Sequence, residues 1–223
     1  MKYIYTNTPI EKAATFAANK LIEHLTKGER VLLLLSGGSG AAIAIDVAKR
    51  LININLSNLV VSMTDERYGL VGHKDENWQQ LIDAGLNLPG ATLYRPLIGQ
   101  DIETTTEKFN NWLAEQFKSA DYKFGIFGMG NDGHTAGIKP NSDAVSSLNL
   151  AAFFKSEDFE RITITLPTIR KIDEAVIQAS GIEKRAVIRD LIYKDIPLND
   201  QPAQILKIIP HAILYTNNQR EEL

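Results

Sequence analysis

The chain has 223 residues, of which 44% are hydrophobic and 23% charged, and its formal net charge is −3. A chain of this length and composition can bury a large core, and without a basic surplus it has no general attraction for nucleic acid. No cysteine is present, which excludes disulfides, thiolate metal sites and a cysteine nucleophile.

The N-terminal segment lacks the pattern of a signal peptide, and the longest apolar run, residues 31–35, is too short to span a bilayer. We therefore expect a cytoplasmic protein that does not bind membranes. No repeat, low-complexity tract or linker interrupts the sequence, so we expect one domain over residues 1–223.

Short apolar segments alternate with amphipathic ones, which is typical of a mostly parallel sheet covered by helices. The stripe of Val187, Ile188, Leu191 and Ile192 predicts a helix, and Pro202 suits a first helical turn. In chain order we expect helix 10–26, strand 31–35, helix 40–52, strand 59–63, helices 74–85 and 103–119, strands 123–127, 161–166 and 175–179, helices 184–194 and 202–208, and strand 212–216.

Four polar segments, three of them rich in glycine, follow predicted strands at residues 36–40, 64–67, 128–134 and 180–184. In open α/β sheets, ligands bind outside the carboxyl ends of the strands. Four such segments at corresponding strand ends therefore predict one composite pocket. The alternative, that glycine only ends a strand, explains any single loop more readily than all four together.

The first two segments carry different chemistry. Residues 36–40, Ser-Gly-Gly-Ser-Gly, precede a predicted helix, where backbone N–H groups can approach an anion; a tight turn is the alternative. The segment is neither a Walker loop nor GxGxxG, so it does not predict a nucleotide site. Residues 64–67, Thr-Asp-Glu-Arg, place three charges directly after an apolar strand, where they need partners; a solvated loop or structural ion pair is the alternative.

The segment 128–135, Gly-Met-Gly-Asn-Asp-Gly-His-Thr, is the strongest local signal. Asp132 and His134 stand two residues apart across a glycine, so the carboxylate can orient the imidazole, which is a good general base near neutral pH. No metal-ligand spacing and no GxSxG nucleophile motif is present, so we expect neither a metal site nor a serine triad. The remaining histidines have no comparable setting: His24, His73 and His211.

Two cations stand near predicted strand ends. Arg161 begins one predicted strand, and Lys184 opens a predicted helix after Gly181. Together they could bind a phosphate, although from the residues alone an ordinary surface charge is the more common explanation for each.

The combined segments resemble the 6-phosphogluconolactonase family from about residue 30 to residue 216. The segments that carry the resemblance are LSGGSG, TDERY…DEN, GIFGMGNDGHTAGIKP, ERITITLP and SGIEK. The resemblance implies a Rossmann-like α/β fold with an open, mostly parallel sheet flanked by helices. It also implies hydrolysis of 6-phospho-D-glucono-1,5-lactone to 6-phosphogluconate in the oxidative pentose phosphate pathway, with no organic cofactor.

The resemblance also implies residue roles. His134 would be the base that activates water, with Asp132 as its neighbour, and Asp65 and Arg67 would line the reacting end of the sugar. Lactone hydrolysis needs such a base, a group that stabilises an oxyanion, and a grip on the phosphate. The phosphate cradle would consist of Gly37, Gly38, Ser39, Arg161 and Lys184.

The sequence departs from the family pattern at four places. Gly40-Ala41 replaces Thr-Pro, Glu76 replaces the serine of Asp-Ser-Asn, Gly137-Ile138-Lys139-Pro140 replaces Ser-Leu-Phe-Pro, and residues 155–159 replace a proline-rich run. We expect these changes to affect affinity and fine specificity more than the class of reaction.

Two other functions compete with lactone hydrolysis: a glucosamine-6-phosphate deaminase of the same fold, and a non-catalytic sugar-phosphate sensor. Deaminases carry a glutamate five residues after the histidine, where this chain has Lys139, so we expect no deaminase activity. A sensor would not need Asp65, Arg67, Asp132 and His134 together. We expect a sugar-phosphate substrate as the only partner of a monomer or weak homo-oligomer.

Overall fold

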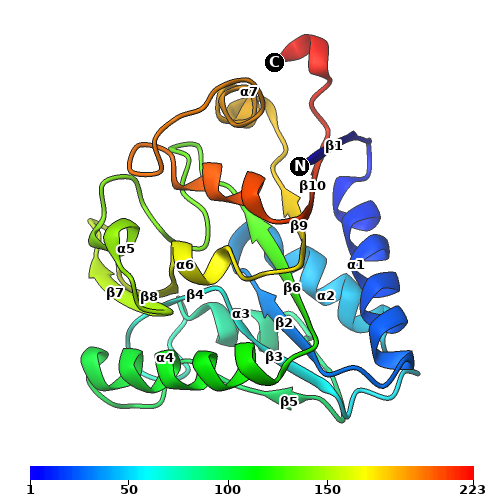
Figure 1. Cartoon of the computed structure of the whole chain (residues 1–223), viewed down its shortest axis with the longest axis vertical. Coiled ribbons are helices and arrows are strands. Elements are labelled where there is room, and N and C mark those ends of the chain that lie inside the picture. The colour runs from blue at the N-terminus through cyan, green and yellow to red at the C-terminus, as the bar shows by residue number, and fades with distance from the viewer.

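The computed structural model describes residues 1–223, and its centre is an all-parallel sheet of seven strands (Figure 1). Strand β2 (Val31–Leu35) is buried along its whole length, which explains its uninterrupted apolar sequence. In spatial order the strands are β1 (Lys2–Tyr5), β10 (His211–Thr216), β9 (Glu174–Gln178), β6 (Tyr122–Gly128), β2 (Val31–Leu35), β3 (Leu59–Met63) and β5 (Thr92–Leu93). The expected open, mostly parallel α/β fold is confirmed.

Helices cover both faces of this sheet, and alternate residues of β2 separate two apolar cores. Val31, Leu33 and Leu35 pack on one side with α1 (Pro9–Thr26), α2 (Ala41–Arg50) and α3 (Asn77–Asp83). Leu32 and Leu34 belong to the other core, to which the remaining elements contribute. These elements are α4 (Ile102–Ser119), α5 (Asp143–Ser146), α6 (Leu166–Ile169), α7 (Arg185–Tyr193), the 3-10 helix η3 (Pro202–Ile208) and a second, smaller sheet.

The smaller sheet is antiparallel and was not expected. It has the order β4 (Asp65–Arg67), β8 (Glu160–Ile164) and β7 (Ala151–Lys155). Asp65 lies opposite Thr163 and Arg67 lies opposite Arg161. The strand predicted at 161–166 thus belongs to this sheet rather than to the parallel one. It ends at Ile164, because Thr165 precedes a helical turn that contains Pro167.

Other differences are local. The segment 202–208 is a 3-10 helix rather than an α-helix; Pro202 begins it, and its first turn is closed by an i→i+3 bond from Gln204 N to Gln201 O at 3.0 Å. The short strands β1, β5 and β7 were not expected from the sequence. No helix of the structure combines the length and apolar character that crossing a membrane requires.

The topology brings four chain segments to one edge of the sheet. From β2 the chain runs through α2 to β3 on one side, whereas from β6 it reaches β9 on the other side. The crevice between β2 and β6 is therefore the point where the strand order reverses, which is where open α/β sheets bind ligands. The carboxyl ends of β2, β3, β6 and β9 meet at this edge.

Candidate active site

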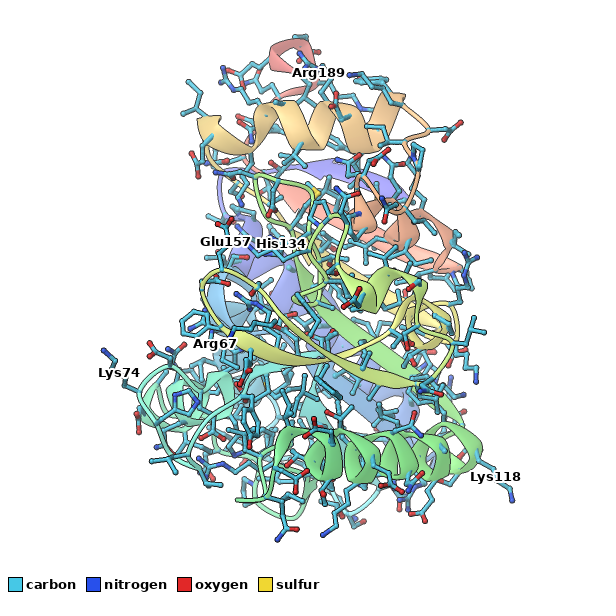
Figure 2. All side chains as sticks on the ribbon, turned by 90° about the vertical axis from the view of Figure 1, so that its left-hand side faces the viewer. Arg67, Lys74, Lys118, His134, Glu157 and Arg189 are labelled. Carbon is cyan, nitrogen blue, oxygen red and sulfur yellow. The ribbon has the colours of Figure 1, made fainter.

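A polar cavity of about 340 Å³ opens at this edge of the sheet. Figure 2 shows His134 and Arg67 near the middle of one side of the molecule, whereas Lys118 and Arg189 lie at its extremities. The cavity is lined by Ser36, Gly37, Gly38, Ser39, Asp65, Arg67, Asn77, Gly128, Met129, Gly130, His134, Ala136, Gly137, Lys139, Asp158, Arg161 and Lys184. The predicted site residues are thus brought together, except that Asp132 lies behind His134 rather than on the cavity wall.

The glycine-rich loop after β2 leads through a 3-10 turn, Gly38–Gly40, into the N-terminus of α2. A Cβ at Gly37 would lie 2.2 Å from Asn77 Oδ1, so only glycine fits against the buried Asn77. A Cβ at Gly128 would lie 2.6 Å from Ser39 Oγ, which explains a second glycine across the cavity. The loop therefore presents backbone N–H groups and a helix N-terminus, an arrangement that favours an anion.

The three charged side chains of strand β4 point in two directions, because successive side chains of a strand lie on opposite faces of the sheet. Asp65 and Arg67 line the cavity. Glu66 points the other way and is fully buried, where it accepts hydrogen bonds from the backbone N–H of Arg67 (2.8 Å), Asn77 (2.6 Å) and Trp78 (2.9 Å). Burial raises the pKa of Glu66 to about 8, although these N–H donors oppose the shift. Glu66 thereby joins β4 to the start of α3.

His134 and Asp132 form a close pair in the loop after β6. His134 Nδ1 lies 2.6 Å from Asp132 Oδ1, which also accepts the His134 backbone N–H at 3.1 Å. The hydrogen bond from His134 holds the pKa of Asp132 well below its usual range, so the carboxylate is ionised near neutral pH. A Cβ at Gly130 would lie 2.1 Å from Nδ1, so this glycine makes room for the ring. With Nδ1 donating to Asp132, a neutral ring has its lone pair on Nε2.

The cation Lys184 and the backbone of the loop after β6 are in direct contact. Lys184 Nζ donates a hydrogen bond to Met129 O at 2.7 Å, and the side chain is half-buried at the cavity wall. Burial lowers the pKa of Lys184. The remaining N–H bonds of this ammonium are available to an anion in the cavity.

The second cation, Arg161, is buried and already has acidic partners. Its Nη2 lies 2.7 Å from Asp158 Oδ2, and its Nη1 lies 3.9 Å from Asp65 Oδ2. Burial raises the pKa of Asp158, but the hydrogen bond from Ser156 and the charge of Arg161 outweigh burial and bring it to about 2. Both Arg161 and the opposed Arg67 stack on the ring of Phe159, with guanidinium carbons 5.4 and 4.8 Å from its centroid.

Among the lining side chains that were not predicted as site residues, three carry an amide or a charge: Asn77, Lys139 and Asp158. Lys139 and Asp158 fall in segments where the sequence departs from the family pattern, whereas Asn77 is the last residue of the matching segment Asp75-Glu76-Asn77. Asn77 Nδ2 donates to Asp65 O at 3.1 Å, whereas its buried Oδ1 has no partner. No three His, Asp or Glu side chains lie close enough together to hold a metal ion.

The family described as glucosamine-6-phosphate isomerases/6-phosphogluconolactonase has a model that matches residues 6–213. The chain belongs to this family. The family predicted from the motifs is confirmed.

Individual relatives are distant but cover most of the chain. A protein of Helicobacter pylori named 6-phosphogluconolactonase is 26% identical over 201 residues, which are 87% of each chain. The crystal structure of a 6-phosphogluconolactonase from Shewanella baltica superposes with a TM-score of 0.80 at 20% identity, covering 96% of this chain and 95% of the other. A monomeric glucosamine-6-phosphate deaminase also has a TM-score of 0.80, at 18% identity, covering 100% of this chain and 98% of the other. The shared fold thus spans both activities of the family, and the cavity must distinguish them.

Proposed function

We propose that this protein hydrolyses 6-phospho-D-glucono-1,5-lactone to 6-phosphogluconate, the lactonase step of the oxidative pentose phosphate pathway. The observation that carries the proposal is the His134–Asp132 pair at a polar cavity that is also lined by four basic side chains. Curated relatives named 6-phosphogluconolactonase, matched over most of the chain, support the same activity.

In the proposed reaction His134 is the general base. Its Nε2 removes a proton from a water molecule as the water oxygen forms a bond to the lactone carbonyl carbon. The tetrahedral oxyanion collapses, the bond from this carbon to the ring oxygen breaks, and the imidazolium returns the proton to the ring oxygen. The products are a hydroxyl group and a carboxylic acid that ionises. Arg67 supports this step, because a cation beside the reacting carbon stabilises the oxyanion.

The phosphate would lie against Arg161, Lys184 and the loop of Gly37, Gly38 and Ser39. Two cations, backbone N–H groups and a helix N-terminus are the groups that bind a dianionic phosphate. Binding the phosphate also fixes the position of the lactone ring, so that binding energy remote from the reaction lowers the barrier to it.

The deaminase alternative has support from the structural likeness to a monomeric deaminase. The deaminase pattern needs a glutamate at the position of Lys139, and a lysine cannot act as a carboxylate there. Ammonia release from glucosamine 6-phosphate should therefore be undetectable at the protein concentration used for lactone hydrolysis. Comparable turnover of the two substrates would make the deaminase the better assignment.

The decisive assay couples 6-phosphogluconate formation from fresh lactone to 6-phosphogluconate dehydrogenase. Because the lactone also hydrolyses spontaneously, the enzymatic rate must rise in proportion to protein concentration above a blank without protein. Binding of 6-phosphogluconate without any acceleration would instead identify a sugar-phosphate sensor.

A further inference from the structure

Lys139 contacts the His134–Asp132 pair at the carboxylate oxygen that the imidazole does not occupy. Its Nζ lies 3.5 Å from Asp132 Oδ2, whereas His134 occupies Oδ1 at 2.6 Å. Both oxygens of the carboxylate are therefore engaged, one by the imidazole and one by the ammonium. Lys139 also lines the cavity.

The backbone that carries Lys139 is fixed relative to His134. Thr135 and Ile138 form an isolated bridge, with Ile138 N donating to Thr135 O at 2.9 Å. Ala136 has a φ of 49°, a conformation that a non-glycine residue keeps only when its surroundings enforce it. Ser142 Oγ donates to Lys139 O at 2.7 Å. Lys139 thus directly follows a hydrogen-bonded turn that begins at Thr135, the residue after the histidine.

Stability does not explain this contact. About a third of the Lys139 side chain and two fifths of the Asp132 side chain are exposed, at 32% and 41%. Ion pairs this exposed contribute little to folding, because water screens them. The place of Lys139, behind the carboxylate that orients the proposed base, points to the reaction instead.

We propose that Lys139 is a positioning residue of the lactonase reaction, which acts through Asp132 on His134. This inference rests on the proposed function. The ammonium holds the second carboxylate oxygen, so that the plane of Asp132 and hence the ring of His134 stay fixed. It also places a positive charge beside the pair, so that a change of charge at position 139 changes the electrostatic field at the imidazole.

Other charged groups line the same cavity as His134 and Lys139, and they remain constant when only Lys139 is changed. They are Asp65, Arg67, Asp158, Arg161 and Lys184. A change that follows the charge at position 139 can therefore be assigned to that position.

The test is a charge series at one position: Lys139→Arg, Lys139→Gln and Lys139→Glu. The kcat is measured from pH 5 to 8 with the spontaneous rate subtracted, since kcat reports the enzyme–substrate complex. For Lys139→Gln we expect kcat at pH 7 to fall about 3- to 10-fold, KM to change less than about twofold, and the midpoint of the acid limb to rise by about 0.5 to 1 pH unit. Lys139→Glu should raise the midpoint of the acid limb further, and Lys139→Arg should retain the wild-type pH profile.

The matched control is Lys118→Gln, which removes the same charge from the exposed end of α4, far from His134 in Figure 2. It should leave the whole pH profile unchanged. An acid limb that stays in place throughout the charge series, in variants with wild-type thermal unfolding, would overturn the inference. A rise in KM with an unaltered kcat profile would also overturn it, because that result describes a substrate contact.

A second measurement separates this inference from the proposed function. The imidazole of His134 is titrated by NMR in the free protein, wild type and variants. If its midpoint follows the charge at position 139 while no variant accelerates lactone hydrolysis, the coupling stands and only the proposed function fails. If lactone hydrolysis is present but neither midpoint moves, the function stands and the role of Lys139 is rejected.

Discussion

The two sheets supply the cavity in different ways. The parallel sheet contributes through loops that begin where its strands end, and these loops carry Ser39, His134 and Lys184. The antiparallel sheet contributes through the strands themselves, with Arg67 on β4 and Arg161 on β8. Glycines let the loops approach a ligand closely. Strands instead fix the spacing and direction of side chains by their register. The proposed base and the opposed arginines therefore depend on different parts of the fold.

The largest effect on activity is expected for a substitution in the loop after β6, which the parallel sheet contributes to the cavity. His134→Asn should reduce lactone hydrolysis by about 10²- to 10⁴-fold, the usual contribution of a general base. Thermal unfolding should be unchanged, because the ring is partly exposed and belongs to a loop. The measurement is kcat/KM by the coupled assay. Turnover near the wild-type value in a folded variant would contradict the role of His134.

Next in size is a comparison of the two proposed phosphate ligands, one from each sheet. Lys184→Ala and Arg161→Ala should each cost about 1.5 to 3 kcal/mol in kcat/KM for the phosphorylated lactone. Hydrolysis of unphosphorylated gluconolactone should hardly change. Only Arg161→Ala should also lower the melting temperature, because it leaves the buried Asp65 without its cation.

The control for both variants is Lys118→Ala, which should alter neither quantity. If Lys184→Ala impairs the phosphorylated and unphosphorylated substrates equally, Lys184 is not a phosphate ligand.

A smaller, purely structural effect is expected at Glu66, which joins β4 to α3. Glu66→Gln places an amide donor among three backbone N–H donors, so the free energy of unfolding should fall by about 1 to 3 kcal/mol. For a chain of this length the melting temperature should fall by about 2–4 °C per kcal/mol. The exposed Glu115→Gln on α4 is the control, and an equal melting temperature for both variants would contradict the role of Glu66.

This stability difference should depend on pH. The pKa of Glu66 is raised to about 8 in the folded protein, above its value in the unfolded chain. The folded state therefore binds this proton more tightly, and the resulting stabilisation is complete below pH 4 and lost as the pH rises through 8. In denaturant unfolding, the difference in the free energy of unfolding between the wild type and Glu66→Gln should shrink from pH 4 to pH 8. A difference that grows with pH would contradict the raised pKa of Glu66.

The parallel sheet was largely predictable from sequence, and the smaller sheet was not. Strands 31–35 and 59–63 have the expected bounds, because buried parallel strands are continuous apolar runs. Strand β4 consists of Asp, Glu and Arg, and their partners lie far along the chain, at Trp78 and Arg161 among others. A pattern of neighbouring residues in the sequence cannot show which distant residues will pair with them. The strand that ends at Ile164 was recognised, but an apolar pattern does not specify which sheet it joins.

The same distinction holds for the cavity. The glycine-rich loops could be assigned to one pocket, because parallel strands bring their carboxyl ends to a common edge. Lys139 and Asp158 could not, because a side chain on a loop enters the cavity or leaves it according to turns that local sequence does not determine. Asn77 begins α3, and its place at the cavity depends on the contact of that helix end with Asp65 O. Lys139, for example, owes its direction to the turn at Ala136 and Gly137, both with positive φ.

The opposed arginines of the smaller sheet have a consequence for handling the protein. Two like charges directly opposite across a strand pair destabilise it, and Arg67 and Arg161 are such a pair. An anion that bound near both guanidinium groups would reduce that repulsion, and it would bind only the folded chain. Ligand and fold are then thermodynamically linked, and an anion at 100 times its dissociation constant adds about 2.7 kcal/mol to the free energy of unfolding. A phosphate buffer should therefore stabilise the folded protein during purification and storage more than an amine buffer does.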